Sequence, residues 1–152
     1  MKAEYVNPFL QGAVLVFRDL LNEEIIRGKT SVKPDATPSH EIAILLNVTG
    51  SVQGQVVYSL NAETAYKLAE KLMPGTDRAT IEKEYRDVLG ELGNMITGNA
   101  LNIFLNSKKD LDLSVPYVAD TRSQRIDIPK RTALALNLYS KPGMIELNIA
   151  LE

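Results

Sequence analysis

The segment from Glu84 to Asn106 constrains this chain most, because its residue pattern predicts one long helix with two different faces. At about 100° per residue, five apolar residues gather on one arc that would pack on a core. These are Val88, Leu92, Met95, Ile96 and Ile103. A second stripe, roughly 120° away, places two acids, an amide and a glycine at helical spacing. Its members are Asp87, Glu91, Asn94 and Gly98.

Three glycines fall inside this one predicted helix, at positions 90, 93 and 98. Each costs up to about 1 kcal/mol relative to alanine in a helix interior. We therefore expect close approach to the helix backbone at these positions, and we interpret Gly90 and Gly93 as residues of internal packing.

Two further helices are predicted. Asn7-Pro8 suits the start of the first, since Asn is a favoured N-cap and Pro needs no N–H donor in the first turn. Gly28 is predicted to end this helix, and the polar segment 28–40 to be a surface loop. Asn61 is predicted to cap a shorter helix over 62–73, and Thr80 to cap the long one.

Alternation of apolar and polar residues predicts the strands. Two hairpins are expected, one from 41–48 and 52–60, the other from 132–139 and 144–151. A run over 111–117 is interrupted by Pro116, which favours an edge or a bulge, and 125–129 can add a short strand or turn. Helices and strands are segregated, so we predict an α+β fold: a mostly antiparallel sheet with two long helices and one shorter helix packed on it.

Composition narrows the class of function. The chain has 152 residues, the length of one domain, and no cysteine, so no disulfide or thiolate metal site is expected. A net charge of −2 and the lack of a basic stripe argue against nucleic-acid binding. No window reaches the roughly 18 apolar residues of a membrane span, and the first five residues do not begin a signal peptide. We expect one domain over residues 1–152, without membrane attachment, in the cytoplasm.

The spacing Asp87-x₃-Glu91-x₂-Asn94, with Pro116 22 positions beyond Asn94, carries a family resemblance. It resembles the signature of the CheC/CheX/FliY family of chemotaxis phosphatases, which dephosphorylate the response regulator CheY. The glycine-rich flanks on a long helix and the hairpin before it agree with this resemblance.

Other segments resemble the CheX branch in particular. The run over 91–100 (ELGNMITGNA) and the opening over 7–9 (NPF) are most similar to it. CheC-like members carry a second acid–amide pair on their first long helix, whereas here the segment 9–18 reads FLQGAVLVFR and has none. The resemblance therefore implies a chain with one site.

The resemblance also implies roles for the residues of the stripe. Glu91 and Asn94 would be catalytic, with Glu91 pairing with a lysine of a phosphorylated CheY-like response regulator. Asp87, Gly98 and Pro116 would belong to the partner-binding surface. Mg²⁺ is expected on the regulator, with no metal or other cofactor bound by this chain itself. A homodimer with edge strands paired across subunits is expected as well.

The chemistry agrees with these roles. An aspartyl phosphate is already reactive, so its hydrolysis mainly needs a water held in line with the bond that breaks. An amide has no useful pKa near neutrality, so Asn94 would orient this water rather than deprotonate it, as a Gln does in GTPases. Glu91 lies one helical turn away, at roughly 5 Å. Its docking contact would decide where Asn94 lands.

Several nearby residues also have structural interpretations. Asp87 can support the site or simply be solvated. Asn99 turns towards the apolar arc, so we expect it to be buried and hydrogen-bonded rather than catalytic. His40, the single histidine, lies in the predicted loop and is not expected to be catalytic.

Two other functions compete with the phosphatase. A non-catalytic binding module for a receiver domain or a flagellar switch component would use the same surface. A carboxylate hydrolase with Asp87 and Glu91 as its acid–base pair is disfavoured, because two acids one turn apart on an exposed helix lack the cleft that would separate their pKa values.

Overall fold

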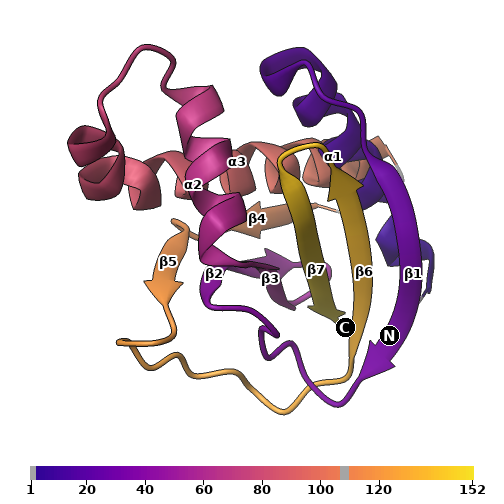
Figure 1. The fold of residues 1–152 in the computed structure, drawn as a ribbon. Helices are drawn as coiled ribbons and strands as arrows, with labels where there is room; N and C mark the ends of the chain where they lie inside the picture. The colour runs from indigo at the N-terminus through magenta and orange to yellow at the C-terminus, as the bar shows by residue number, and fades with distance from the viewer. Residues whose placement is uncertain (1–2, 107–109) are drawn as a thin grey trace.

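An antiparallel sheet with a layer of helices on one face forms the fold (Figure 1). The computed structural model describes residues 3–106 and 110–152. In chain order the elements are η1 (Ala3–Tyr5), α1 (Val6–Leu21), β1 (Ile26–Lys33), β2 (Ile42–Gly50), β3 (Gly54–Leu60), α2 (Ala62–Leu72), α3 (Arg78–Asn106), β4 (Leu111–Leu113), β5 (Tyr117–Asp120), β6 (Ala133–Ser140) and β7 (Gly143–Leu151). The predicted α+β class, with two long helices and one shorter helix, is confirmed.

The strands follow the order β1-β6-β7-β3-β2-β4, and β5 pairs with β2 beside β4. Every pairing is antiparallel. Both predicted hairpins are present, as β2–β3 and β6–β7. Alternation placed them correctly because one face of each strand is buried against the helices.

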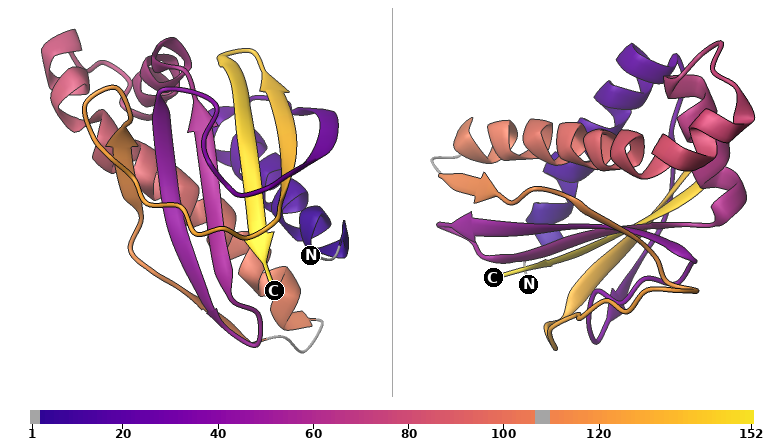
Figure 2. Two further views of the ribbon diagram at one scale, coloured as in Figure 1. Left: turned by 90° about the horizontal axis from the view of Figure 1, so that it is seen from below. Right: turned by 90° about the vertical axis from the view of Figure 1, so that its left-hand side faces the viewer.

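Two apolar clusters cover the two faces of the sheet. The main core lies between the sheet and the helices, as the right-hand view of Figure 2 shows, and includes Phe9, Leu46 and Leu92. A small cluster on the other face lies beneath the segments 34–40 and 121–131, which cross the sheet in the left-hand view of Figure 2. The helix layer is thus held by the larger core.

The prediction of a surface loop over 28–40 is wrong for its first part, because residues 26–33 form β1. β1 pairs only with β6 among the described strands, so it is an edge strand, and almost all of its side chains are exposed. A strand exposed on both faces has no alternating pattern to reveal it. Gly28 lies inside this strand, and α1 ends instead at Leu21, with Asn22 as a left-handed C-cap at φ 53°.

The long helix begins earlier than predicted. Asp77 caps it, because its Oδ1 accepts a hydrogen bond from the Thr80 backbone N–H at 2.8 Å. Thr80 is therefore a residue of the first turn and not the cap. Asn61 does cap α2, accepting from Thr64 N at 2.8 Å as predicted. Residues 125–129 form no strand, so the predicted alternative of a short strand there is wrong.

Candidate functional site

The predicted stripe lies on the outer side of α3. Asp87 and Glu91 are exposed, and Asn94 and Gly98 are partly exposed. The opposite side of the helix is buried, with Leu89, Leu92 and Ile96 in the core. An outside molecule can therefore reach the acids and the amide together.

The polar side chains of the stripe make no contact with one another or with the rest of the described chain through a hydrogen bond or an ion pair. Among the hydrogen bonds and ion pairs of residues 3–106 and 110–152, none involves the side chain of Asp87, Glu91 or Asn94. An exposed carboxylate and a partly exposed amide one turn apart, without partners in the described part of the chain, can bind external groups without first breaking a contact.

Two contacts fix the rotation of α3 at the stripe. A Cβ placed on Gly93 would lie 2.8 Å from Ile44 Cγ2 of β2, so the helix backbone sits directly on the sheet there. One turn beyond Asn94, the buried Thr97 hydroxyl lies 2.8 Å from the Tyr58 hydroxyl of β3. Burial raises the pKa of Tyr58 well above its ordinary value, so this hydroxyl stays protonated. Together these two contacts fix the direction in which α3 presents the Asn94 side chain.

A third contact joins α3 to α1. A Cβ on Gly12 would lie 2.7 Å from the Ile96 carbonyl oxygen and 3.3 Å from Ala100 N. The two helices therefore cross backbone against backbone, which only a residue without a side chain allows.

Pro116 lies beside the stripe, in the bend between β4 and β5. A Cβ on Gly90, the residue before Glu91, would lie 3.4 Å from Pro116 Cγ. The two flanking residues, Val115 and Tyr117, are 86% and 45% exposed. Pro116 interrupts the strand pattern as predicted, since it lies between β4 and β5. Its ring packs on α3 one turn before Asn94. Gly90 and Gly93 are both packing positions, as predicted.

Gly98 differs from the other helical glycines, because no atom of the described residues lies within 4 Å of a Cβ built on it. It lines a groove of about 590 Å³ between α1 and α3, together with Leu15, Leu20 and Met95. Leu15 and Leu20 are 38% and 47% exposed. We did not predict this groove, although the α1 segment FLQGAVLVFRDLL carries apolar residues on more than one face.

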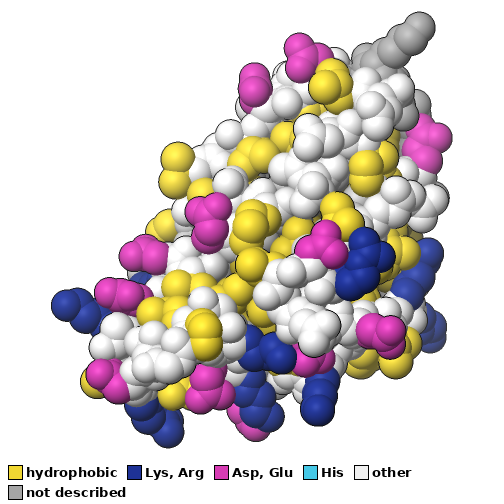
Figure 3. Space-filling model, turned by 90° about the horizontal axis from the view of Figure 1, so that it is seen from above, with side chains coloured by type: hydrophobic (Ala, Val, Ile, Leu, Met, Phe, Trp, Pro, Cys, Tyr) yellow, Lys and Arg dark blue, Asp and Glu magenta, His cyan; other side chains and the backbone are white. Residues whose placement is uncertain are grey.

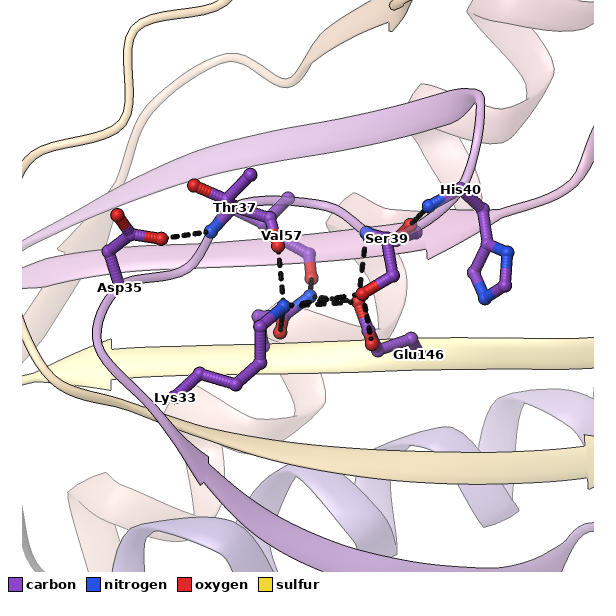
Figure 4. Close-up of polar contacts among 9 residues, drawn as sticks. Lys33, Asp35, Thr37, Ser39, His40, Val57 and Glu146 are labelled. Carbon is purple, nitrogen blue, oxygen red and sulfur yellow. Dashed lines mark hydrogen bonds and ion pairs between the residues drawn. The ribbon is translucent and has the colours of Figure 1, made fainter.

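Asn99 and His40 have structural surroundings. The Asn99 amide donates from Nδ2 to the Met95 carbonyl oxygen at 3.1 Å, and the side chain is partly exposed rather than buried as predicted. The His40 backbone N–H donates to Ser59 Oγ at 2.9 Å (Figure 4).

The best-connected polar cluster is elsewhere, on the sheet face away from the helices (Figure 4). Lys33 Nζ lies 2.9 Å from Asn148 Oδ1 and 3.5 Å from Glu146 Oε1, and Ser39 Oγ donates to Glu146 at 2.7 Å. Burial alone would raise the pKa of Glu146. Hydrogen bonds from Asn148 and Ser39 and the charge of Lys33 outweigh it, so this pKa is lowered. Each of these four side chains has a hydrogen-bond partner, so the cluster is structural and holds segment 34–40 on the sheet.

Within 3–106 and 110–152, no three His, Cys, Asp or Glu side chains gather where they could hold a metal ion. None of the described helices is long and apolar enough to cross a membrane.

Comparison with known proteins points to one family. The family model described as chemotaxis phosphatase CheX matches residues 42–137, which include the stripe and Pro116. The CheY-P phosphatase CheX of Thermotoga maritima is 29% identical over 126 residues, which are 83% of this chain and 81% of that protein.

Solved structures share the fold. The chemotaxis protein CheX of Desulfovibrio desulfuricans superposes with a TM-score of 0.86 at 19% identity, covering 98% of this chain and 99% of that one. The CheX–CheY–BeF₃–Mg²⁺ complex of Borrelia burgdorferi gives a TM-score of 0.80 at 26% identity, covering 99% of each chain.

Proposed function

Since this chain belongs to the CheX family of chemotaxis phosphatases, we propose that it hydrolyses the aspartyl phosphate of a CheY-like response regulator. The observation that carries the proposal is the pair Glu91, which is exposed, and Asn94, which is partly exposed, on one face of α3 and free of partners among the described residues. The family model covers 63% of the chain, and the solved relatives cover nearly all of it, which supports one phosphatase domain over residues 1–152.

Asn94 orients the attacking water. Its amide can accept a hydrogen bond from the water and donate one to a phosphoryl oxygen, and it needs no change of protonation. Such positioning is steep in distance, since an error of about 1 Å costs about 10²-fold in rate. The seating of α3 at Gly93 and Thr97 supports this role, because it limits the movement of the helix that carries the amide.

Glu91 docks the regulator. Its carboxylate is exposed and makes no ion pair within the described part of the chain, so it can pair with a lysine of the partner. That contact lies one turn from Asn94, and a docking error at Glu91 would displace the amide. Asp87 extends the acidic surface towards the start of α3, where it adds attraction for a cationic partner.

Gly98 and Pro116 shape the partner-binding surface at its two ends. Gly98 leaves the backbone of α3 open to an approaching loop. Pro116 packs on Gly90 and forms a rigid border at the other end of the partner-binding surface.

The magnesium ion of the reaction belongs to the regulator. The two acids of the stripe, Asp87 and Glu91, are exposed and have no third ligand beside them among residues 3–106 and 110–152. The solved complex of the Borrelia relative contains both CheY and Mg²⁺, which supports a partner that brings its own ion. Such a regulator places the reaction in the cytoplasm.

The chain works as a homodimer in this proposal, with edge strands paired across subunits. β1 supports it, because among the described strands it pairs only with β6 and leaves its other edge open. A measurement of mass in solution tests this assembly.

The decay of phosphorylated regulator tests the function. Each CheY-like regulator of the organism is phosphorylated with a small phosphodonor, and loss of the phosphoryl group is followed with and without the chain, Mg²⁺ being present in both arms. Faster decay with substoichiometric chain supports the phosphatase. Unchanged decay, together with measurable binding, would establish instead a non-catalytic module for a receiver domain or a flagellar switch component.

A further inference from the structure

The outer surface of the helix layer holds more apolar area than the stripe itself explains. Figure 3 looks onto this layer, where hydrophobic side chains gather in the middle and charged side chains of both signs lie around them. Two adjoining hollows of about 590 and 500 Å³ follow the crossing of α1 and α3 and share Leu15, Asn99 and Asn102. We call the first of them, lined by Leu15, Leu20, Met95 and Gly98, the α1–α3 groove.

The groove and the stripe share one residue. Gly98 closes the stripe formed by Asp87, Glu91 and Asn94, and it also lines the groove. Gly12 and Gly93 are required inside the fold, because a Cβ on either would meet a neighbour at 2.7 or 2.8 Å. Gly98 has no such neighbour and still carries the helix cost of up to about 1 kcal/mol. Packing within the described residues therefore gives no reason for a glycine at this position.

The size of the stripe shows that a partner must extend beyond it. Four residues over eleven positions make a column about 17 Å long and roughly 6 Å wide, on the order of 100 Å². A standard interface buries about 800 Å² on each partner. A regulator whose phosphoryl group reaches Asn94 therefore covers the surface on both sides of the stripe, and on one of those sides lies the groove.

From this continuity we propose that the α1–α3 groove receives an apolar side chain of the same regulator, carried on a loop beside its phosphorylated aspartate. The inference rests on the proposed function for the identity of the partner. The groove has the composition of an interface centre: Leu15 and Leu20 are exposed, Met95 is partly buried, and Asp19 is the one charged residue among those that line it. In this arrangement Glu91 docks the regulator and Asn94 orients the attacking water, while the groove contributes binding affinity and selectivity among regulators.

Variants of the groove test the proposal through KM. Gly98→Leu fills the groove, and open space around the added side chain keeps the fold intact. Its matched control is Ala79→Leu, which adds the same side chain at an exposed position near the start of the same helix. A second, independent variant, Leu15→Gln with Leu20→Gln, removes apolar surface without changing charge. We expect both groove variants to raise KM about tenfold or more with kcat within about twofold, and the control to match the wild type.

Unchanged KM in both groove variants would overturn the proposal. So would a fall in solution mass in both groove variants, because it would show that a second copy of this chain fills the groove. A wild-type chain that fails to accelerate decay refutes the proposed function, but it leaves the groove testable. Binding of the regulator, trapped with beryllofluoride and Mg²⁺, is then compared between wild type and Gly98→Leu. Weaker binding supports the groove, and equal or absent binding refutes it.

Discussion

The Tyr58 hydroxyl lies 2.8 Å from the Thr97 hydroxyl, inside the core and one helical turn beyond the partly exposed amide of Asn94. Both residues are at most 1% exposed. A contact hidden from solvent thus joins the centre of the sheet to the helix that carries the stripe.

Tyr58→Phe should destabilise the protein by about 1–3 kcal/mol, because it leaves the buried Thr97 hydroxyl without its partner. Adding Thr97→Val should recover most of this loss, since both polar groups are then absent. Urea unfolding measures both. Tyr139→Phe is the matched control, exposed on β6, and should stay within about 0.5 kcal/mol of wild type. A double variant no more stable than the single one would contradict the assignment.

Two glycines of α3 should respond to alanine in opposite directions. Gly93→Ala places a Cβ 2.8 Å from Ile44 Cγ2, so the free energy of unfolding should fall despite the better helix propensity. Gly98→Ala meets nothing and should raise it by up to about 1 kcal/mol. Thermal and urea unfolding of the pair check this. Equal effects of the two substitutions would show that the contact of α3 with the sheet at Ile44 can adjust to an added Cβ at little cost in stability.

Asn94→Ala should lower kcat for phospho-regulator decay by about 10²-fold, because no other group of the stripe can orient the water in the same way. The fold should be unaffected, since the side chain makes no hydrogen bond among the described residues. Lys83→Ala, an exposed change on the same helix, provides the control. Wild-type kcat in Asn94→Ala would remove the proposed mechanism.

Glu91→Gln keeps the shape of the side chain and removes its charge. KM should rise by roughly three- to tenfold, with a smaller fall in kcat, and the difference from wild type should shrink as salt is added. Steady-state decay at two ionic strengths measures this. Glu70→Gln, an exposed acid on α2, should change neither constant. A salt-independent difference would argue against a charge–charge contact.

Asp120 makes stability depend on pH. The hydrogen bond and charge of Arg122 lower the pKa of its carboxyl from 3.8 to about 2 in the folded protein. A lowered folded pKa stabilises the fold above the unfolded value, and this contribution is lost as the pH falls from about 4 to about 2. Asp120→Asn should therefore be less stable than wild type at pH 7, with a gap that narrows below pH 4. Unfolding of both at pH 7, 4 and 3, with exposed Asp127→Asn as the control, tests the sign.

The parts of the fold that sequence reasoning located are those with apolar residues packed against the helices. Val56 and Tyr58 alternate because they face the helices, so the hairpin was recognisable. β1 was missed because it is an edge strand whose residues, such as Ile26 and Val32, are about 70% exposed. Nothing in its pattern distinguishes that exposure from a loop.

The stripe was predictable for a different reason. Helical spacing alone places Asp87, Glu91, Asn94 and Gly98 on one side, and the structure keeps them there. The groove was not predictable, because Leu20 fits the apolar period of α1 and could equally have been core, while Leu15 lies on another face of the helix. Only the crossing at Gly12 decides that they face outward beside α3.

That crossing has a thermodynamic consequence for recognition. Where α1 and α3 cross, the Ile96 carbonyl of α3 packs against the Gly12 backbone of α1. The distance between the two helices that line the groove therefore does not depend on side-chain rotamers. A receptor preorganised in this manner loses little conformational entropy on encounter, and discrimination among similar ligands then depends on shape. Regulators that differ by a single methyl group at the contact should be told apart without any rearrangement of the helices.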